Sequence, residues 1–247
     1  MTGRCDSPAL ADARWHGLGD TAVVLVPLGS TEQHGPHLPY DTDTVIAAAV
    51  ARAAAQRLLD RGAPALVAPA LAYGASGEHQ DFPGTVSIGE EALSAVVIEM
   101  ARSLRTWSPR VVFVNGHGGN VRALAAAVAQ LRAEGHDAAW APCAVAGADA
   151  HAGRTETSLM LHLAPERVRL QDAVAGPPAP VAELMPALRE RGVRAVSPTG
   201  VLGDPTDACP EHGALILGAM VESFSRRLTA GAVDRHGCLR DVAQVAP

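Results

Sequence analysis

Lysine is missing from this sequence, so all 20 basic residues are arginines, and 26 acidic residues bring the formal net charge to −6. The arginines are scattered along the chain and form no basic cluster. Proteins that bind nucleic acid usually concentrate positive charge on one face or along one segment. We therefore expect no nucleic-acid partner.

Cysteine is scarce as well. The chain has four, at positions 5, 143, 209 and 238, and no two of them form a C-x-x-C pair. Zinc knuckles need closely paired cysteines, and disulfide frameworks are typical of small secreted chains that are dense in cysteine. We expect neither kind of scaffold.

Long apolar runs are also absent. No stretch of 18 apolar residues occurs, and the first residues, MTGRCDSPALADARW, lack the apolar segment of a secretory signal. These absences predict a cytoplasmic protein that does not enter membranes. The 247 residues are 48% hydrophobic and 19% charged, which is ample for a core, and no linker-like segment interrupts them. We expect a single domain over residues 1–247.

Apolar runs and helix-like stretches alternate along the chain. We predict strands at residues 21–28, 65–70, 110–114 and 138–142, and helices at residues 44–60, 91–107, 121–133, 212–228 and up to 163. A capping box of Ser87 and Glu90 should precede the second helix. Residues 172–186 should wrap the surface, and residues 193–208 should form a loop with turns. The alternation predicts an α/β fold, a three-layer α/β/α sandwich with a mainly parallel sheet.

The densest run of metal-capable side chains follows the first predicted strand. Residues 27–43, PLGSTEQHGPHLPYDTD, contain Glu32, His34, His37, Asp41 and Asp43. The glycines and prolines among them exclude a helix, and in an extended or irregular segment Glu32 and His34 face the same way. A carboxylate and an imidazole on one side of a loop, with a second carboxylate nearby, predict a divalent cation site.

Two of these residues allow a structural interpretation. Asp41 and Asp43 both precede a helix, and either could cap it. We predict that Asp41 caps the helix and that Asp43 binds the metal. We interpret His37 as a structural residue and not as a ligand.

Two more polar loops follow predicted strands. Residues 115–120 are NGHGGN, with His117 between glycines, and residues 151–158 are HAGRTETS. Ligands bind beyond the carboxyl ends of strands in parallel sheets, so all three loops should meet at one edge. His117 is predicted to be functional. His151 could equally be a solvated loop histidine, Glu156 a helix-start acid favoured by the macrodipole, and His79 a residue that closes a polar loop.

Four motifs in order, GSTEQHGPHLPYDTD, SGEHQDFPGT, NGHGGN and HAGRTETS, resemble the creatininase family of metal-dependent amidohydrolases. Within it, the loops YGASGEHQDFPGTVSIG, DAHAGRTETSLMLHLAP and VSPTGVLGDPT are most similar to the peptidase members of mycofactocin biosynthesis. The resemblance implies an α/β sandwich with one or two divalent cations per chain at the strand ends, and a homo-oligomer. Ligands that are oxygen and nitrogen atoms suit Zn²⁺, Fe²⁺ or Mn²⁺.

Carried over by position, the resemblance implies that Glu32, Asp43 and His117 bind one cation, and that His34 with a bridging Asp43 binds the other. Creatinine-hydrolysing members have a glutamate where this chain has Gly119, and Glu156 is the natural replacement. The resemblance further implies that His151 passes a proton to the leaving nitrogen. It also implies that Ser76 and His79 approach the substrate.

The function predicted from this resemblance is metal-dependent hydrolysis of a peptide bond, releasing a C-terminal dipeptide from a modified precursor peptide. The alternative in the same class is a small cyclic-amide or formamide hydrolase, although Gly119 counts against creatinine. A different class, a non-catalytic nucleotide-binding protein, would use the glycine-rich turn at residues 115–120 to hold phosphate. It would leave Glu32, His34 and Asp43 without a role.

Overall fold

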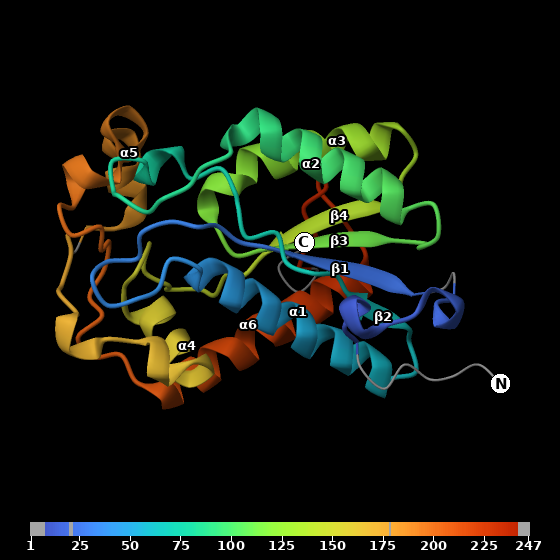
Figure 1. Cartoon of the computed structure of the whole chain (residues 1–247), viewed down its shortest axis with the longest axis horizontal. Coiled ribbons are helices and arrows are strands. Elements are labelled where there is room, and N and C mark those ends of the chain that lie inside the picture. Colours follow the sequence, from blue (N-terminus) through green and yellow to red (C-terminus); the bar gives the residue numbers. More distant parts are fainter. Residues whose placement is uncertain (1–7, 20–21, 178, 242–247) are drawn as a thin grey trace, which may run out of the picture.

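The computed structural model describes residues 8–19, 22–177 and 179–241. Its centre is a parallel sheet of four strands in the order β2-β1-β3-β4 (Figure 1). The strands are β1 (Val23–Leu28), β2 (Ala65–Val67), β3 (Val111–Asn115) and β4 (Ala138–Pro142). They are almost entirely apolar and buried, as expected for parallel strands that are covered on both faces.

Helices cover both faces of this sheet (Figure 1). α2 (Gly89–Leu104) and α3 (Val121–Ala133) pack on one face, in a cluster that includes Val24 and Val26 of β1. α1 (Thr42–Asp60) and α6 (Pro210–Ala230) pack on the other, in a cluster that includes Leu25. Successive side chains of β1 thus enter opposite layers, as the pleat of a strand requires. The predicted three-layer α/β/α architecture is confirmed.

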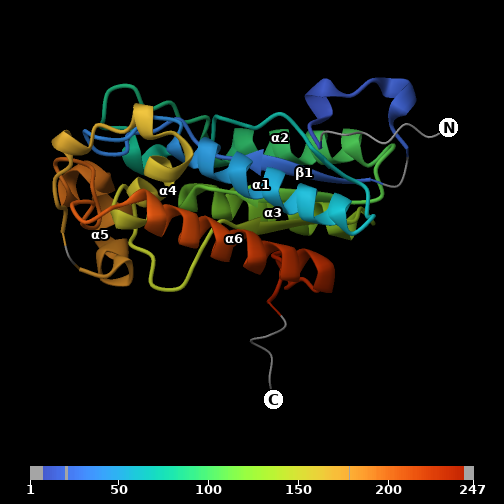
Figure 2. The same cartoon turned by 90° about the horizontal axis from the view of Figure 1, so that it is seen from below.

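Two helices lie beyond these layers. α4 (Arg154–Leu163) packs against α6, which runs along the underside of the molecule (Figure 2). α5 (Val181–Val196) packs against the short turn η3 (Gly77–His79) at the end of the molecule where β1, β3 and β4 terminate. Within the described part of the chain, no helix has the length and apolar character that a membrane span requires.

The predictions for α3 and β4 match the observed bounds, and the other predicted strands and helices differ from the observed ones by a few residues at their ends. Thr21, the first residue of the first predicted strand, lies outside the described residues, as does Cys5. The capping box is wrong: α2 begins at Gly89, so Ser87 lies too early to cap it. The Ser87 hydroxyl instead accepts hydrogen bonds from the backbone N–H groups of Ser76 and Gly89.

α5 was not predicted, because its sequence carries two signals against a helix. Pro186 lies inside it and cannot donate a backbone hydrogen bond. Gly192 has a φ of 73° and kinks the segment. The predictions of an irregular surface segment at residues 181–186 and of a loop at residues 193–196 are wrong, because both stretches belong to this helix.

The register of the strands brings three loops together. Leu28 of β1 lies opposite Asn115 of β3, which lies opposite Pro142 of β4, so the three strands end level with one another. The segments that follow them carry Glu32, His117 and His151. The prediction that the polar loops meet at one sheet edge is confirmed.

Candidate metal centre

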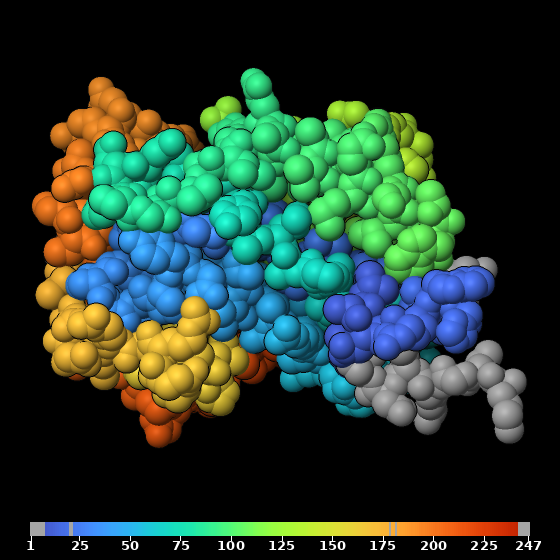
Figure 3. Space-filling model, in the orientation of Figure 1, coloured from blue at the N-terminus to red at the C-terminus, as the bar shows by residue number. Residues whose placement is uncertain are grey.

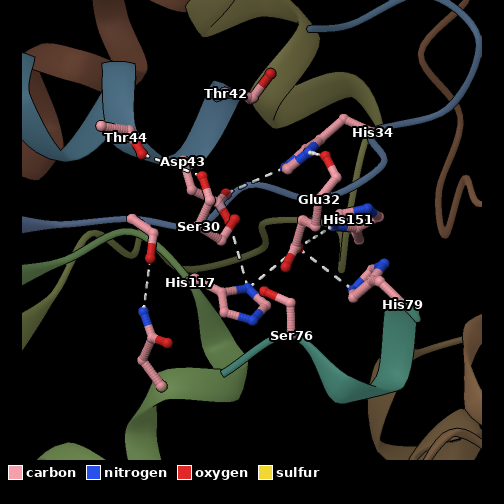
Figure 4. Close-up of polar contacts among 12 residues, drawn as sticks. Ser30, Glu32, His34, Thr42, Asp43, Thr44, Ser76, His79, His117 and His151 are labelled. Atoms are coloured by element: carbon pink, nitrogen blue, oxygen red, sulfur yellow. Dashed lines mark hydrogen bonds and ion pairs between the residues drawn. The ribbon is translucent and has the colours of Figure 1, made fainter. Parts of the chain in front are cut away.

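Glu32 lies at the centre of the cluster in the loop after β1, and its side chain is completely buried (Figure 4). Its Oε1 atom lies 3.1 Å from His117 Nδ1, 3.3 Å from His79 Nε2 and 3.7 Å from His151 Nδ1. Neither carboxylate oxygen has a hydrogen-bond partner. An unsatisfied carboxylate is costly to bury unless a positive charge compensates it. A fully buried carboxylate whose nearest polar neighbours are histidine nitrogens fits a cation at the centre.

Asp43 enters the same space from the first turn of α1. Its Oδ1 lies 3.1 Å from His34 Nε2, and its Oδ2 lies 3.3 Å from His117 Nδ1. The Ser30 hydroxyl donates to Oδ2 over 2.7 Å and holds the carboxylate in place. His34 Nδ1 lies 3.1 Å from its acceptor, the Glu32 carbonyl oxygen, which leaves Nε2 for the site. Asp43 therefore lies between two imidazoles, as a bridging ligand would.

The segment before α4 supplies the opposite side of the cluster. Ala152 has a φ of 52°, a strained conformation for a residue with a Cβ, and its backbone N–H donates to Glu156 Oε2 over 2.6 Å. The turn places Glu156 Oε2 3.8 Å from His34 Nε2. His151 is held by backbone hydrogen bonds in both directions with Leu202.

Three groups of side chains have their potential ligand atoms within 4.8 Å of one another. They are Glu32, Asp43 and His117; His34, His151 and Glu156; and Glu32, His79 and His151. The first is the ligand set expected for one cation, and the second brings Glu156 to His34. Carboxylate and imidazole ligands without thiolate suit Zn²⁺, Mn²⁺ or Fe²⁺.

Eight of the residues singled out in the sequence gather around this centre: Glu32, His34, Asp43, Ser76, His79, His117, His151 and Glu156. Ser76 is fully buried, its hydroxyl has no hydrogen-bond partner, and Figure 4 shows it near His117. Two other candidates lie elsewhere. His37 Nε2 is 2.8 Å from the Thr157 hydroxyl. Asp41 occupies the cap position of α1, but its side chain pairs with Arg167 and makes no capping hydrogen bond, so the predicted cap is wrong.

Gly119 cannot carry a side chain in this fold. A Cβ there would overlap the Ala75 carbonyl oxygen and His117, and would lie 2.5 Å from Glu78 Oε1. The carboxylate of Glu78 fills that space, with Oε1 3.5 Å from His117 Nε2. Sequence reasoning missed Glu78 because its place in the site depends on how the loop at residues 73–85 folds over the third strand.

The charged groups of the centre shift one another's pKa values. Burial lowers the pKa of His34, but Asp43 outweighs burial and raises it to about 10. The pKa of His117 is raised well above its ordinary value, because Glu32 and Asp43 overcome burial. Burial acts to raise the pKa of Glu32, yet His117 and His79 bring it down to about 2. In the absence of a cation, two imidazoliums thus face two carboxylates, and a cation must displace protons to bind.

His79 and His151 behave in the opposite way. Burial lowers the pKa of His79 to about 4. Burial, together with the nearby His34, lowers the pKa of His151 well below its ordinary value. Both imidazoles are therefore neutral near pH 7 and are suited to exchange protons or donate hydrogen bonds. Burial also raises the pKa of Glu156 to about 7.

The centre lies in a pocket of about 1340 Å³. One wall is formed by α5, through residues such as Met185 and Leu188, and the opposite wall by the start of α2 and by Arg122. α5 is attached through a small hydrophobic cluster in which Leu188, Val193 and Leu202 are buried, with Phe82 and Ala150 packed against them. Figure 3 shows α5 and the segment with η3 side by side on the surface.

Comparison with known proteins gives consistent matches. The family creatininase, described as creatinine amidohydrolase, matches residues 9–228. The mycofactocin precursor peptide peptidase of Mycolicibacterium smegmatis is 58% identical over 88% of both chains. That of Mycobacterium tuberculosis H37Rv is 57% identical over 83% of this chain and 84% of its own. The creatinine amidohydrolase of Pseudomonas putida is 32% identical over 82% of this chain and 87% of its own.

Solved structures agree with these matches. A crystal structure of creatinine amidohydrolase, 29% identical, superimposes with a TM-score of 0.71 over 89% of this chain and 96% of that one. Two other creatininase structures, both 28% identical with the same coverage, are described as a mutant of Zn-Zn type and as a manganese form, with TM-scores of 0.70 and 0.71.

Proposed function

Because this chain belongs to the creatininase family, whose members are metal-dependent amidohydrolases, we propose that it is a peptidase that releases a C-terminal dipeptide from a modified precursor peptide. Hydrolysis of an amide or peptide bond follows from the family itself. The finer assignment is supported by the 58% identity to the mycofactocin precursor peptide peptidase of M. smegmatis. We further propose that the 247 residues form one domain that acts in the cytoplasm as a homo-oligomer.

The observation that carries the choice of substrate is the pocket above the metal centre. Pockets for drug-sized ligands measure roughly 300–1,000 Å³, and this one is about 1340 Å³. It has room for the end of a peptide, whereas creatinine or another small cyclic amide would fill little of it. The nucleotide-binding alternative is disfavoured because the turn at residues 115–120 is used internally. Asn120 donates to the Gly29 carbonyl oxygen, and Asn115 donates to that of His117.

We assign the residues of the centre by position and geometry. Glu32, Asp43 and His117 would hold one divalent cation, and His34, Asp43 and Glu156 a second, with zinc, manganese or iron as candidates. Bound there, the cations would supply a Lewis acid for the scissile carbonyl and would lower the pKa of an attacking water. The free hydroxyl of Ser76 would orient the substrate beside them.

His151 would move the proton that hydrolysis requires. Its Nδ1 atom faces the centre, 3.7 Å from Glu32 Oε1, and its ring is neutral near pH 7. Nδ1 would accept a proton from the attacking water while the new C–O bond forms. It would then donate this proton to the leaving nitrogen as the C–N bond breaks. The second proton of the water leaves the new carboxyl group and is taken up by the amine, so the products are a carboxylate and an ammonium group, and atoms and charges balance.

Product analysis tests the function. The purified protein, loaded with zinc or manganese, is incubated separately with the modified precursor peptide, with creatinine and with an N-formyl amide, and the products are identified by mass spectrometry. We expect a C-terminal dipeptide and the shortened peptide. A higher kcat/KM for creatinine or the formamide would instead establish the small-amide alternative.

Glu156→Gln tests the second cation. Glutamine keeps the size of the side chain but loses the charge of a carboxylate ligand, which binds a metal at about 2.0–2.2 Å. We expect bound metal to fall from two cations per chain to one, as measured by elemental analysis, with the cation at Glu32, Asp43 and His117 retained. Glu166→Gln, at an exposed position after α4, is the control. Unchanged metal content would return Glu156 to the role of a helix-start acid.

A further inference from the structure

Gln33, which stands between Glu32 and His34 in the sequence, has its own network of contacts at the centre. Its side chain is buried, and its Oε1 accepts a hydrogen bond from the Gly35 backbone N–H over 2.9 Å. This bond fixes the orientation of the amide, so the NH₂ group points at the imidazoles. Nε2 lies 2.8 Å from His79 Nδ1, 3.3 Å from the Gly200 carbonyl oxygen and 3.1 Å from His151 Nε2.

The contact between Gln33 Nε2 and His79 Nδ1 determines which ring nitrogen of His79 carries the proton. An amide NH₂ group can only donate, so His79 Nδ1 must be the acceptor. In a neutral ring the proton is then on Nε2, which lies 3.3 Å from Glu32 Oε1. His79 therefore presents a hydrogen-bond donor to the centre.

The backbone carbonyl oxygen of Gln33 determines which ring nitrogen of His151 carries the proton. His151 Nε2 lies 2.8 Å from the Gln33 carbonyl oxygen, a distance at which two lone pairs would repel, so Nε2 carries the proton and donates it. The second hydrogen of the Gln33 NH₂ group has the Gly200 carbonyl oxygen as its acceptor. Nδ1 of His151 keeps its lone pair and faces the centre.

We propose that Gln33 is a positioning residue that fixes the proton positions on His79 and His151, so that His79 offers the site a donor and His151 offers it an acceptor. With its Nε2 protonated, His79 cannot bind a cation through that atom, so the group of Glu32, His79 and His151 is not a metal site. The His79 N–H faces Glu32 Oε1, where it can donate to that carboxylate or to the carbonyl oxygen of a substrate. His151 Nδ1 is free to take the proton of the attacking water, a role that rests on the proposed function.

The fold is shaped around this side chain. Gly200 has a φ of 84°, and a Cβ at that position would overlap the Gln33 amide. Gly200 lies in the segment VSPTGVLGDPT, whose Leu202 also pairs with His151. The segment thus contributes a carbonyl oxygen to Gln33 and holds the backbone of one of the two histidines.

NMR can measure directly which ring nitrogen of each histidine carries the proton. The zinc-loaded protein, labelled with ¹⁵N-histidine, is studied by NMR, in which the ¹⁵N shifts distinguish protonated from bare ring nitrogens. We expect His79 and His151 both to be protonated at Nε2. In Gln33→Glu, a carboxylate oxygen faces His79 Nδ1, so the proton should move to Nδ1. In Gln33→Met, the proton of neutral His79 should no longer be confined to Nε2. The proton of His151 should stay on Nε2, because its acceptor is the backbone carbonyl oxygen of residue 33.

Activity gives the second readout. Loss of one hydrogen-bond donor aimed at the developing oxyanion lowers kcat by on the order of 10²–10³-fold. We expect a fall of that size in Gln33→Glu, with KM little changed, and no fall in Gln56→Glu, the same change on the exposed side of α1. A proton on Nδ1 of either histidine in the unmodified protein would overturn the proposal. If the unmodified protein hydrolyses no peptide, the proposed function fails, but the NMR result still decides the proton positions.

Discussion

Asp43→Ala is expected to lose both cations and nearly all hydrolysis. Asp43 Oδ1 and Oδ2 face His34 and His117 respectively, so one carboxylate serves both halves of the centre. Glu32→Ala or His34→Ala removes a ligand from one half only and should lose less metal. Since metal ions contribute several kcal/mol to catalysis, activity should fall by about 10³-fold or more.

Elemental analysis and kcat measured on the same preparation check this prediction. Asp41→Ala is a matched control, because Asp41 lies two residues earlier at the same helix start and pairs with Arg167 at the surface. It should keep its metal and its activity. Asp43→Asn, which preserves volume, separates loss of ligation from loss of folding. Full metal content together with full activity in Asp43→Ala would refute the two-metal assignment.

His151→Ala is the second variant for which we expect a large loss of activity, but here the loss should occur without loss of the cation at Glu32, Asp43 and His117. If His151 transfers the proton to the leaving nitrogen, kcat should fall by on the order of 10²–10⁴-fold, the usual contribution of general acid–base catalysis. The cation held by Glu32, Asp43 and His117 should remain, because His151 is not part of that group. Metal content and kcat of the variant are compared with those of His162→Ala, an exposed histidine on α4. Loss of metal along with activity would make His151 a ligand in the group with His34 and Glu156.

Much of the fold follows from local patterns in the sequence. The short, mostly apolar runs at residues 110–114 and 138–142 predict buried strands, and Gly135 ends the helix between them after Ala133. The general rule for ligand sites in parallel sheets then predicted where Glu32, His117 and His151 would meet. These predictions succeed because each depends on neighbouring residues or on a general property of the fold.

The parts that sequence could not predict depend on packing between distant loops. The Gln33 side chain contacts His79, His151 and Gly200, which are far from it in the sequence. An uncharged amide in a sequence does not by itself indicate a functional site. Glu78 reaches His117 only because Gly119 leaves space for it. α5 forms despite Pro186, because its apolar side chains find partners such as Phe82 and Leu202 that belong to other segments.

The cluster beneath α5 makes the two walls of the pocket unequal. Phe82 follows the turn with His79, Ala150 precedes His151, and Leu202 pairs with His151, so α5 shares one packed unit with the segments that carry both histidines. The opposite wall is different, because Glu90 and Arg122 form an exposed ion pair there, away from that cluster. Substitutions of Glu90 or Arg122 are therefore expected to alter the α2 side of the pocket without moving that cluster. On the α5 side, a substitution in the shared cluster is expected to move His79 and His151 as well, so that a change in pocket shape there would also change the positions of both imidazoles.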